Sequence, residues 1–156
     1  MTITAAPAVN ATSTGTQVKR RTPLLLRVLS LVAFVQFAGH GALFVRAKPS
    51  HGPAEVAVVE AMQSNRFTFA ASPRSYWDMY FGYGLEAAAI CLVEAILFWQ
   101  LARIAARDSG LVRPIAWLFL AANVGHFVML TMYFAFPLPM VFDTLIAAGL
   151  AAVIAA

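Results

Sequence analysis

The feature that most constrains this chain is an apolar stretch, residues 76–106, that is long enough to cross a membrane yet carries three acidic residues. Asp78, Glu86 and Glu94 recur at a spacing of eight, so on an α-helix they follow one slowly drifting ridge. A carboxylate at membrane depth costs about 2.5–3.5 kcal/mol on insertion scales and rarely faces lipid. The stretch therefore predicts a membrane-spanning helix whose acidic ridge is covered by other spans.

Composition supports a membrane protein. Of the 156 residues, 61% are apolar and 12% are charged, whereas soluble domains average about 25% charged residues. A soluble domain of this size has too little interior to hide so much apolar surface. The net charge of +4 comes from basic residues that are scattered or flank apolar runs, which indicates contacts with lipid headgroups rather than with nucleic acid. The single cysteine, Cys91, excludes an intramolecular disulfide.

Four spans are predicted, over residues 23–45, 76–105, 114–134 and 138–156, in a single domain that follows a disordered cytoplasmic tail over residues 1–22. A signal peptide is the alternative for the first run. That run is longer than a signal sequence and is interrupted by Arg27, which favours an uncleaved helix. Residues 54–64, in the first loop, have apolar positions at helical spacing and predict a short interfacial amphipathic helix, with residues 65–74 as its exit loop. The aromatic residues between Tyr76 and Tyr83 are interpreted as anchors at the membrane–water boundary.

Lysine and arginine placement predicts the orientation. Seven of these residues lie in the N-terminal part and the second loop, against four in the first loop and none in the third, which favours cytoplasmic termini. The predicted fold class is all-α: an integral membrane up-down-up-down four-helix bundle.

This topology brings polar residues of all four spans to one depth. Counting 1.5 Å per residue places six of them in the outer half of the bundle: Gln36, His40, Glu86, Asn123, His126 and Asp143. Glu94 falls about 12 Å deeper than Glu86 by the same count. Such residues either pair, Glu86 with His126 or Asp143 with His40, to hold the helices in register, or form a functional pocket. No local metal or haem signature accompanies them, so no metal and no cofactor is predicted.

Two segments carry a resemblance to a known group of proteins. SYWDMYFGYGL with the later WQLARIA, and TMYFAFPLPMVFDTLIAAGLAAVIA near the end, resemble small uncharacterised bacterial four-span membrane proteins. This likeness implies a multi-pass protein of the bacterial inner membrane and brings no catalytic residues. In size and span number the chain is also similar to DoxX-like proteins and to the sterol-isomerase and sigma-2-receptor superfamily, as an analogy of architecture alone.

Three functions are compatible with these features. The first is binding of a small lipophilic or cationic ligand in the outer-half polar pocket. The second is acid–base isomerisation or redox chemistry on a lipid, with Glu86 and His126 as the proton-transfer pair. The third is an accessory role in a larger membrane complex, for which the small residues near Ala87 and Gly149 permit close packing within one chain or between chains, including in a homo-oligomer. Whether the protein is an enzyme is left open.

Overall fold

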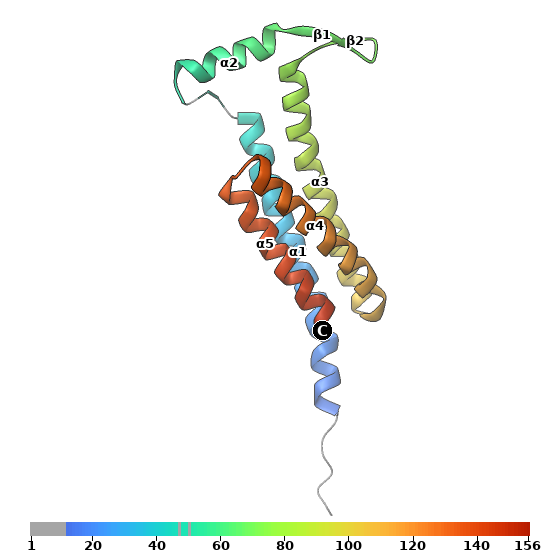
Figure 1. The fold of residues 1–156 in the computed structure, drawn as a ribbon. Coiled ribbons are helices and arrows are strands. Elements are labelled where there is room, and N and C mark those ends of the chain that lie inside the picture. The colour runs from blue at the N-terminus through green and yellow to red at the C-terminus, as the bar shows by residue number, and fades with distance from the viewer. Residues whose placement is uncertain (1–11, 47, 50) are drawn as a thin grey trace, which may run out of the picture. The chain divides into compact units, whose positions relative to one another are not determined.

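The computed structural model describes residues 12–46, 48–49 and 51–156, with side chains described from residue 21 onward. The described chain is mostly helical (Figure 1). Its elements in chain order are α1 (Thr12–Arg46), α2 (Pro53–Ser64), β1 (Arg66–Phe69), β2 (Ser72–Ser75), α3 (Tyr76–Ala105), the short 3₁₀ helix η1 (Gly110–Val112), α4 (Arg113–Tyr133) and α5 (Pro137–Ala155).

Four of these helices are long and apolar enough to cross a membrane, as the sequence predicted. The qualifying segments are Arg21–Arg46, Tyr76–Ala105, Gly110–Tyr133 and Pro137–Ala155. The shortest has 19 residues and is therefore about 28 Å long, close to the roughly 30 Å hydrocarbon core of a bilayer. Helix α1 begins at Thr12, earlier than the predicted start at residue 23; the first part of the predicted tail, residues 1–11, lies outside the described residues.

The chain divides into two compact units. Of the described residues, those up to Ser30 and those from 97 to 156 form the first unit, and those from 31 to 96 form the second.

In the first unit, α4 and α5 pack side by side (Figure 1). The ring of Phe98 on α3 packs against Phe119 on α4, with centroids 5.0 Å apart. Gly149 on α5 is in close contact with Leu29 on α1 and leaves no room there for a larger residue. The apolar core of this unit includes Leu26, Phe98, Ala116, Ile146, Leu150 and Val153.

The connection between α4 and α5 is tight because backbone geometry and proline act together. Ala135 adopts a positive φ of 45° and its N–H donates to the Leu130 carbonyl at 2.8 Å, which closes the end of α4. Pro137 then begins α5, at a position where the missing N–H costs nothing. The connection between the last two spans is therefore short, and α5 begins at Pro137 rather than at the predicted residue 138.

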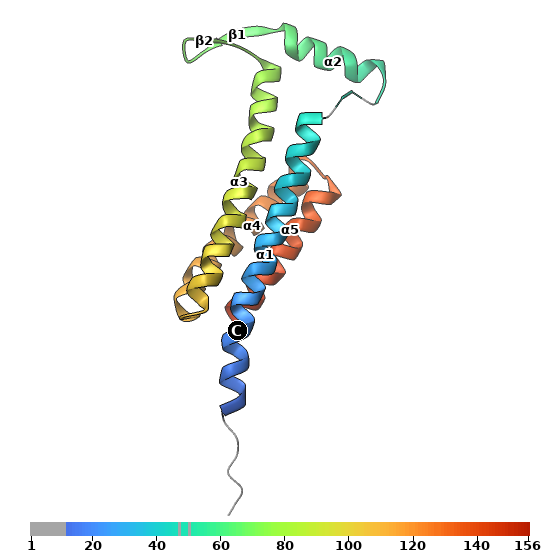
Figure 2. The ribbon, with the colours of Figure 1, turned by 180° about the vertical axis from the view of Figure 1, so that it is seen from behind.

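In the second unit, the end of α1 packs against the start of α3. The Phe44 ring lies directly over Gly84, and Gly41 faces Ala88. Glycines at such positions let two helices approach closely. The α2 helix is present as predicted, and it is followed by a β-hairpin that leads into α3 (Figure 2).

The predicted mostly helical chain is confirmed, and the exit loop predicted over residues 65–74 contains a short β-hairpin that the sequence analysis did not predict. Strands β1 and β2 pair antiparallel, from Arg66 opposite Ser75 to Phe69 opposite Ser72. The two turn residues, Ala70 and Ala71, have positive φ values of 47° and 62°. Two-residue hairpin turns favour asparagine and glycine at such positions, and Pro73 argues against a strand. The sequence therefore lacked the usual hairpin signal.

Helix α3 begins with a reciprocal capping interaction. The Asp78 carboxylate accepts a hydrogen bond from the Ser75 N–H at 2.8 Å, and the Ser75 hydroxyl accepts one from the Asp78 N–H at 3.1 Å. Both bonds satisfy backbone donors that a helix start leaves without partners. Asp78, the first residue of the predicted acidic ridge, thus has a local structural role.

Candidate functional site

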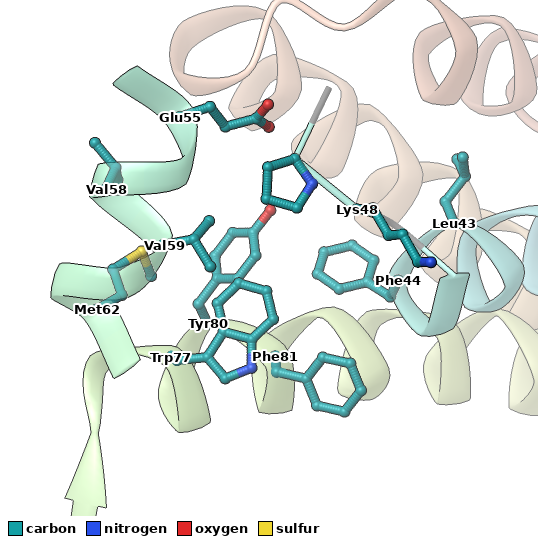
Figure 3. A pocket seen from close by; sticks show the side chains of 11 residues that line it. Leu43, Phe44, Lys48, Glu55, Val58, Val59, Met62, Trp77, Tyr80 and Phe81 are labelled. Carbon is teal, nitrogen blue, oxygen red and sulfur yellow. The ribbon is translucent and has the colours of Figure 1, made fainter. Parts of the chain in front are cut away.

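The candidate site is an aromatic pocket of the second unit, with a volume of about 400 Å³ (Figure 3). Three segments contribute its walls: the end of α1 with the residues after it, one side of α2, and the first turns of α3. The lining residues are Leu43, Phe44, Lys48, Pro49, Glu55, Val58, Val59, Met62, Trp77, Tyr80 and Phe81. The volume falls within the range typical of small-molecule sites.

Ring contacts hold the aromatic wall in place. Phe44 packs on Tyr80 with centroids 5.5 Å apart, and Tyr80 packs on Trp77 at 5.6 Å. Trp77 in turn stacks on Phe81 at 6.2 Å. Because Tyr80 lies one helical turn after Trp77, its ring bridges from α3 to the ring supplied by α1. The result is a continuous set of π faces from two helices, a surface suited to apolar groups and to cations.

Helix α2 supplies the opposite wall because of its register. Glu55, Val58, Val59 and Met62 follow each other at spacings of three and four, so they share one helix face. Pro53 occupies the first turn of α2, and the Asn65 side chain donates to the Ala61 carbonyl at 2.7 Å at its end. These interactions fix both ends of a short helix that buries none of its residues fully.

One acidic and one basic side chain belong to the rim. Glu55 is held in position by His51, whose backbone N–H donates to its carboxylate at 2.6 Å and whose Nδ1 lies 3.2 Å from the same oxygen. Lys48 is exposed, and Figure 3 shows it on a different side of the pocket from Glu55. The pocket thus presents an aromatic wall, an apolar wall and two opposite charges at separate edges.

The six residues of the predicted polar pocket divide between the two units, and their convergence on one site stays a prediction. In the second unit, His40 is half-buried, and its ring lies 4.9 Å from the ring of Phe44, which lines the aromatic pocket. Gln36 is buried one turn away on α1. Glu86 is exposed on α3 and lines neither this pocket nor the one described next, and Glu94 is half-buried.

In the first unit, the structure brings His126 and Asp143 together. Nδ1 of His126 on α4 lies 2.9 Å from a carboxylate oxygen of Asp143 on α5. The Asp143 side chain is 2% exposed, whereas that of His126 is 53% exposed. Asn123, one turn before His126, is buried and lines a second pocket together with Asp143. Three of the six predicted residues therefore do cluster on α4 and α5.

The aromatic pocket itself was missed by the sequence analysis. The aromatic residues at the start of α3 were interpreted as membrane anchors, and α2 was interpreted as a helix lying on the lipid surface. The spacing of Val58, Val59 and Met62 indicates an apolar face, but nothing in the sequence says that this face turns toward Trp77 and Tyr80. Among the described residues, no group of three or more histidine, cysteine, aspartate or glutamate side chains is placed to hold a metal ion.

Comparisons with known proteins add no relative. No family model matches the chain. No curated protein and no solved structure matches it. The resemblance to small bacterial four-span proteins stays a prediction.

Proposed function

We propose that this chain is a polytopic membrane protein that binds a small amphiphile with a zwitterionic head group in the aromatic pocket. Helices α1, α3, α4 and α5 cross the bacterial inner membrane as an up-down-up-down bundle with cytoplasmic termini. The support is their length together with the many large apolar side chains that they expose, such as Leu118 at 72% and Met132 at 70%. Exposed apolar surface of this extent marks contact with lipid or with a partner.

The observation that carries the binding proposal is the aromatic wall beside two opposite rim charges. A quaternary or primary ammonium gains about 0.5–2 kcal/mol from a position over a tryptophan or tyrosine face. The Glu55 carboxylate favours the same positive group, whereas Lys48 favours an anionic group at the other edge. A ligand that carries both charges, with an apolar chain along Val58, Val59 and Met62, uses every wall of the pocket.

The test is binding of decylphosphocholine to the intact protein in maltoside micelles. Replacing Trp99 and Trp117 by phenylalanine leaves Trp77 as the single tryptophan, so that its fluorescence reports on the pocket. We expect a saturable change in emission, with an affinity that falls about tenfold in Tyr80→Leu, the equivalent of about 1.4 kcal/mol. Tyr83→Leu is the matched control because Tyr83 is exposed on the same helix and does not line the pocket.

The two rim charges are separated with a second probe. Decyltrimethylammonium lacks the phosphate, so Lys48→Gln should weaken binding of decylphosphocholine and leave that of decyltrimethylammonium unchanged or stronger. Glu55→Gln should weaken both probes. If Tyr80→Leu and Tyr83→Leu bind decylphosphocholine equally well, the aromatic wall is not a binding site and the proposal is wrong.

A further inference from the structure

A second pocket, in the first unit, has a buried polar atom that no protein group satisfies. It has a volume of about 320 Å³ and is lined by Asn123, Val124, Phe127, Asp143, Thr144, Ala147 and Ala148. Asn123 is 6% exposed, and its Oδ1 has no hydrogen-bond partner. An unsatisfied buried acceptor costs about 1–3 kcal/mol, and the cost rises in surroundings without water.

The other polar groups of this pocket are already engaged. The Thr144 hydroxyl donates to the Met140 carbonyl at 2.8 Å, back along its own helix. The Asp143 carboxylate lies 2.9 Å from His126 Nδ1. Its Oδ2 has this ionic contact but no hydrogen bond. What the pocket lacks is a hydrogen-bond donor: Asn123 Oδ1 has no partner, and Asp143 Oδ2 has only the contact with the imidazole.

We infer that this pocket binds the hydroxyl end of a lipophilic alcohol. The hydroxyl donates to Asn123 Oδ1, and the hydrocarbon chain lies along Phe127, Ala147 and Ala148 in the groove between α4 and α5. An alkylammonium is the weaker match, since His126 already accompanies the carboxylate. A water molecule is the competing occupant, because it could donate to both Asn123 Oδ1 and Asp143 Oδ2; it would give the alcohol no advantage over a matched ether. This site is independent of the aromatic pocket, because all of its residues belong to the other unit.

The test is photolabelling of the full chain in maltoside micelles. The probe is decan-1-ol with a diazirine in mid-chain, and its matched control is the corresponding methyl ether, which has the same chain but no donor. Peptide mapping by mass spectrometry should place the alcohol on α4 and α5. We expect half-maximal labelling at about fivefold lower concentration for the alcohol than for the ether, the difference that one neutral hydrogen bond makes.

Two variants distinguish binding of the probe at this site from its non-specific partition into apolar surface. Asn123→Leu keeps the side-chain volume and removes the acceptor, so the alcohol should lose its advantage over the ether. Thr144→Val, in the same pocket, should keep it, because the Thr144 hydroxyl is directed to its own helix. Equal labelling by alcohol and ether in the unaltered protein overturns the inference, with no variant required. So does an alcohol advantage that survives in Asn123→Leu, or stronger labelling by the matching decylamine probe.

Discussion

At the scale of single residues, Gly84 is a position where packing leaves no space for a side chain. A Cβ built there meets the Phe44 ring, whereas at Gly82, two residues earlier, it meets nothing within 4 Å. The ring cannot move away freely because it is packed against His40 and Tyr80. We therefore expect Gly84→Ala to lower the free energy of unfolding by about 1–3 kcal/mol and to weaken binding in the aromatic pocket.

Gly82→Ala is the matched control for Gly84→Ala. It should be neutral or slightly stabilising, since alanine is favoured over glycine within a helix by up to about 1 kcal/mol. Thermal unfolding in maltoside micelles, followed by circular dichroism, measures both variants. Equal midpoints for the two variants would mean that the Phe44–Gly84 contact is not tight.

The contact between His126 and Asp143 predicts that removing one partner destabilises the protein more than removing both. Asp143 is buried, so its carboxylate depends on the imidazole that lies 2.9 Å away. His126→Leu leaves that charge without its partner and should destabilise the protein by about 1–3 kcal/mol. The double variant His126→Leu/Asp143→Leu removes both groups and should recover much of the loss, because a buried ion pair is often replaceable by apolar residues.

Unfolding midpoints of the wild type, the two single variants and the double variant form the required cycle. If His126→Leu is as stable as the wild type, the contact contributes nothing to the free energy of unfolding. The pairing itself was among the alternatives that the sequence offered for polar residues on different spans. The pairs expected were Glu86 with His126 or Asp143 with His40, whereas the structure pairs His126 with Asp143. Depth along the chain could not decide this, because packing sets the rotation of each helix about its axis.

At the scale of elements, the β-hairpin carries strain that a designed turn removes. Ala70 and Ala71 both have left-handed φ values, which cost about 1–2 kcal/mol per residue with a Cβ. Replacing them by Asn-Gly supplies the residues that a two-residue turn favours. We expect slower amide hydrogen exchange across residues 66–75 and a binding affinity in the aromatic pocket that is unchanged or higher.

The control for the turn variant replaces a glycine at positive φ by alanine, which should have the opposite effect. Gly52 has a φ of 97°, immediately before α2, so Gly52→Ala introduces strain and should accelerate exchange in α2. Faster exchange in the Asn-Gly variant would show that the turn is not formed in solution.

The long helices and α2 were predictable, because hydrophobic length and helical spacing are properties of the sequence itself. The hairpin was not, because Ala-Ala and Pro73 are poor turn and strand residues and its strands form only four paired positions. The aromatic pocket was not predictable either, since it depends on how α2 folds back toward α3. The sequence shows that Trp77 and Tyr80 belong to a cluster of aromatic residues, but only the fold shows that they line a cavity.

At the scale of the whole molecule, the proposed topology predicts which loops are accessible from each side of the membrane. The N-terminal part and the second loop together carry more lysine and arginine residues than the first loop does. This excess favours a cytoplasmic location for the N-terminal part and the second loop. The same orientation places α2, the hairpin and the mouth of the aromatic pocket on the outer side. A ligand from the outer leaflet then reaches the pocket without crossing the membrane.

Cysteine labelling in intact cells tests this topology. Cys91→Ala removes the single native thiol, and Ser64→Cys or Ser109→Cys then places one thiol in the first or the second loop. A membrane-impermeant maleimide should label Ser64→Cys in intact cells and Ser109→Cys only after permeabilisation. The reverse pattern would invert the protein and present the pocket to the cytoplasm. Labelling of both positions in intact cells would show that α3, the one proposed span between them, does not cross the bilayer.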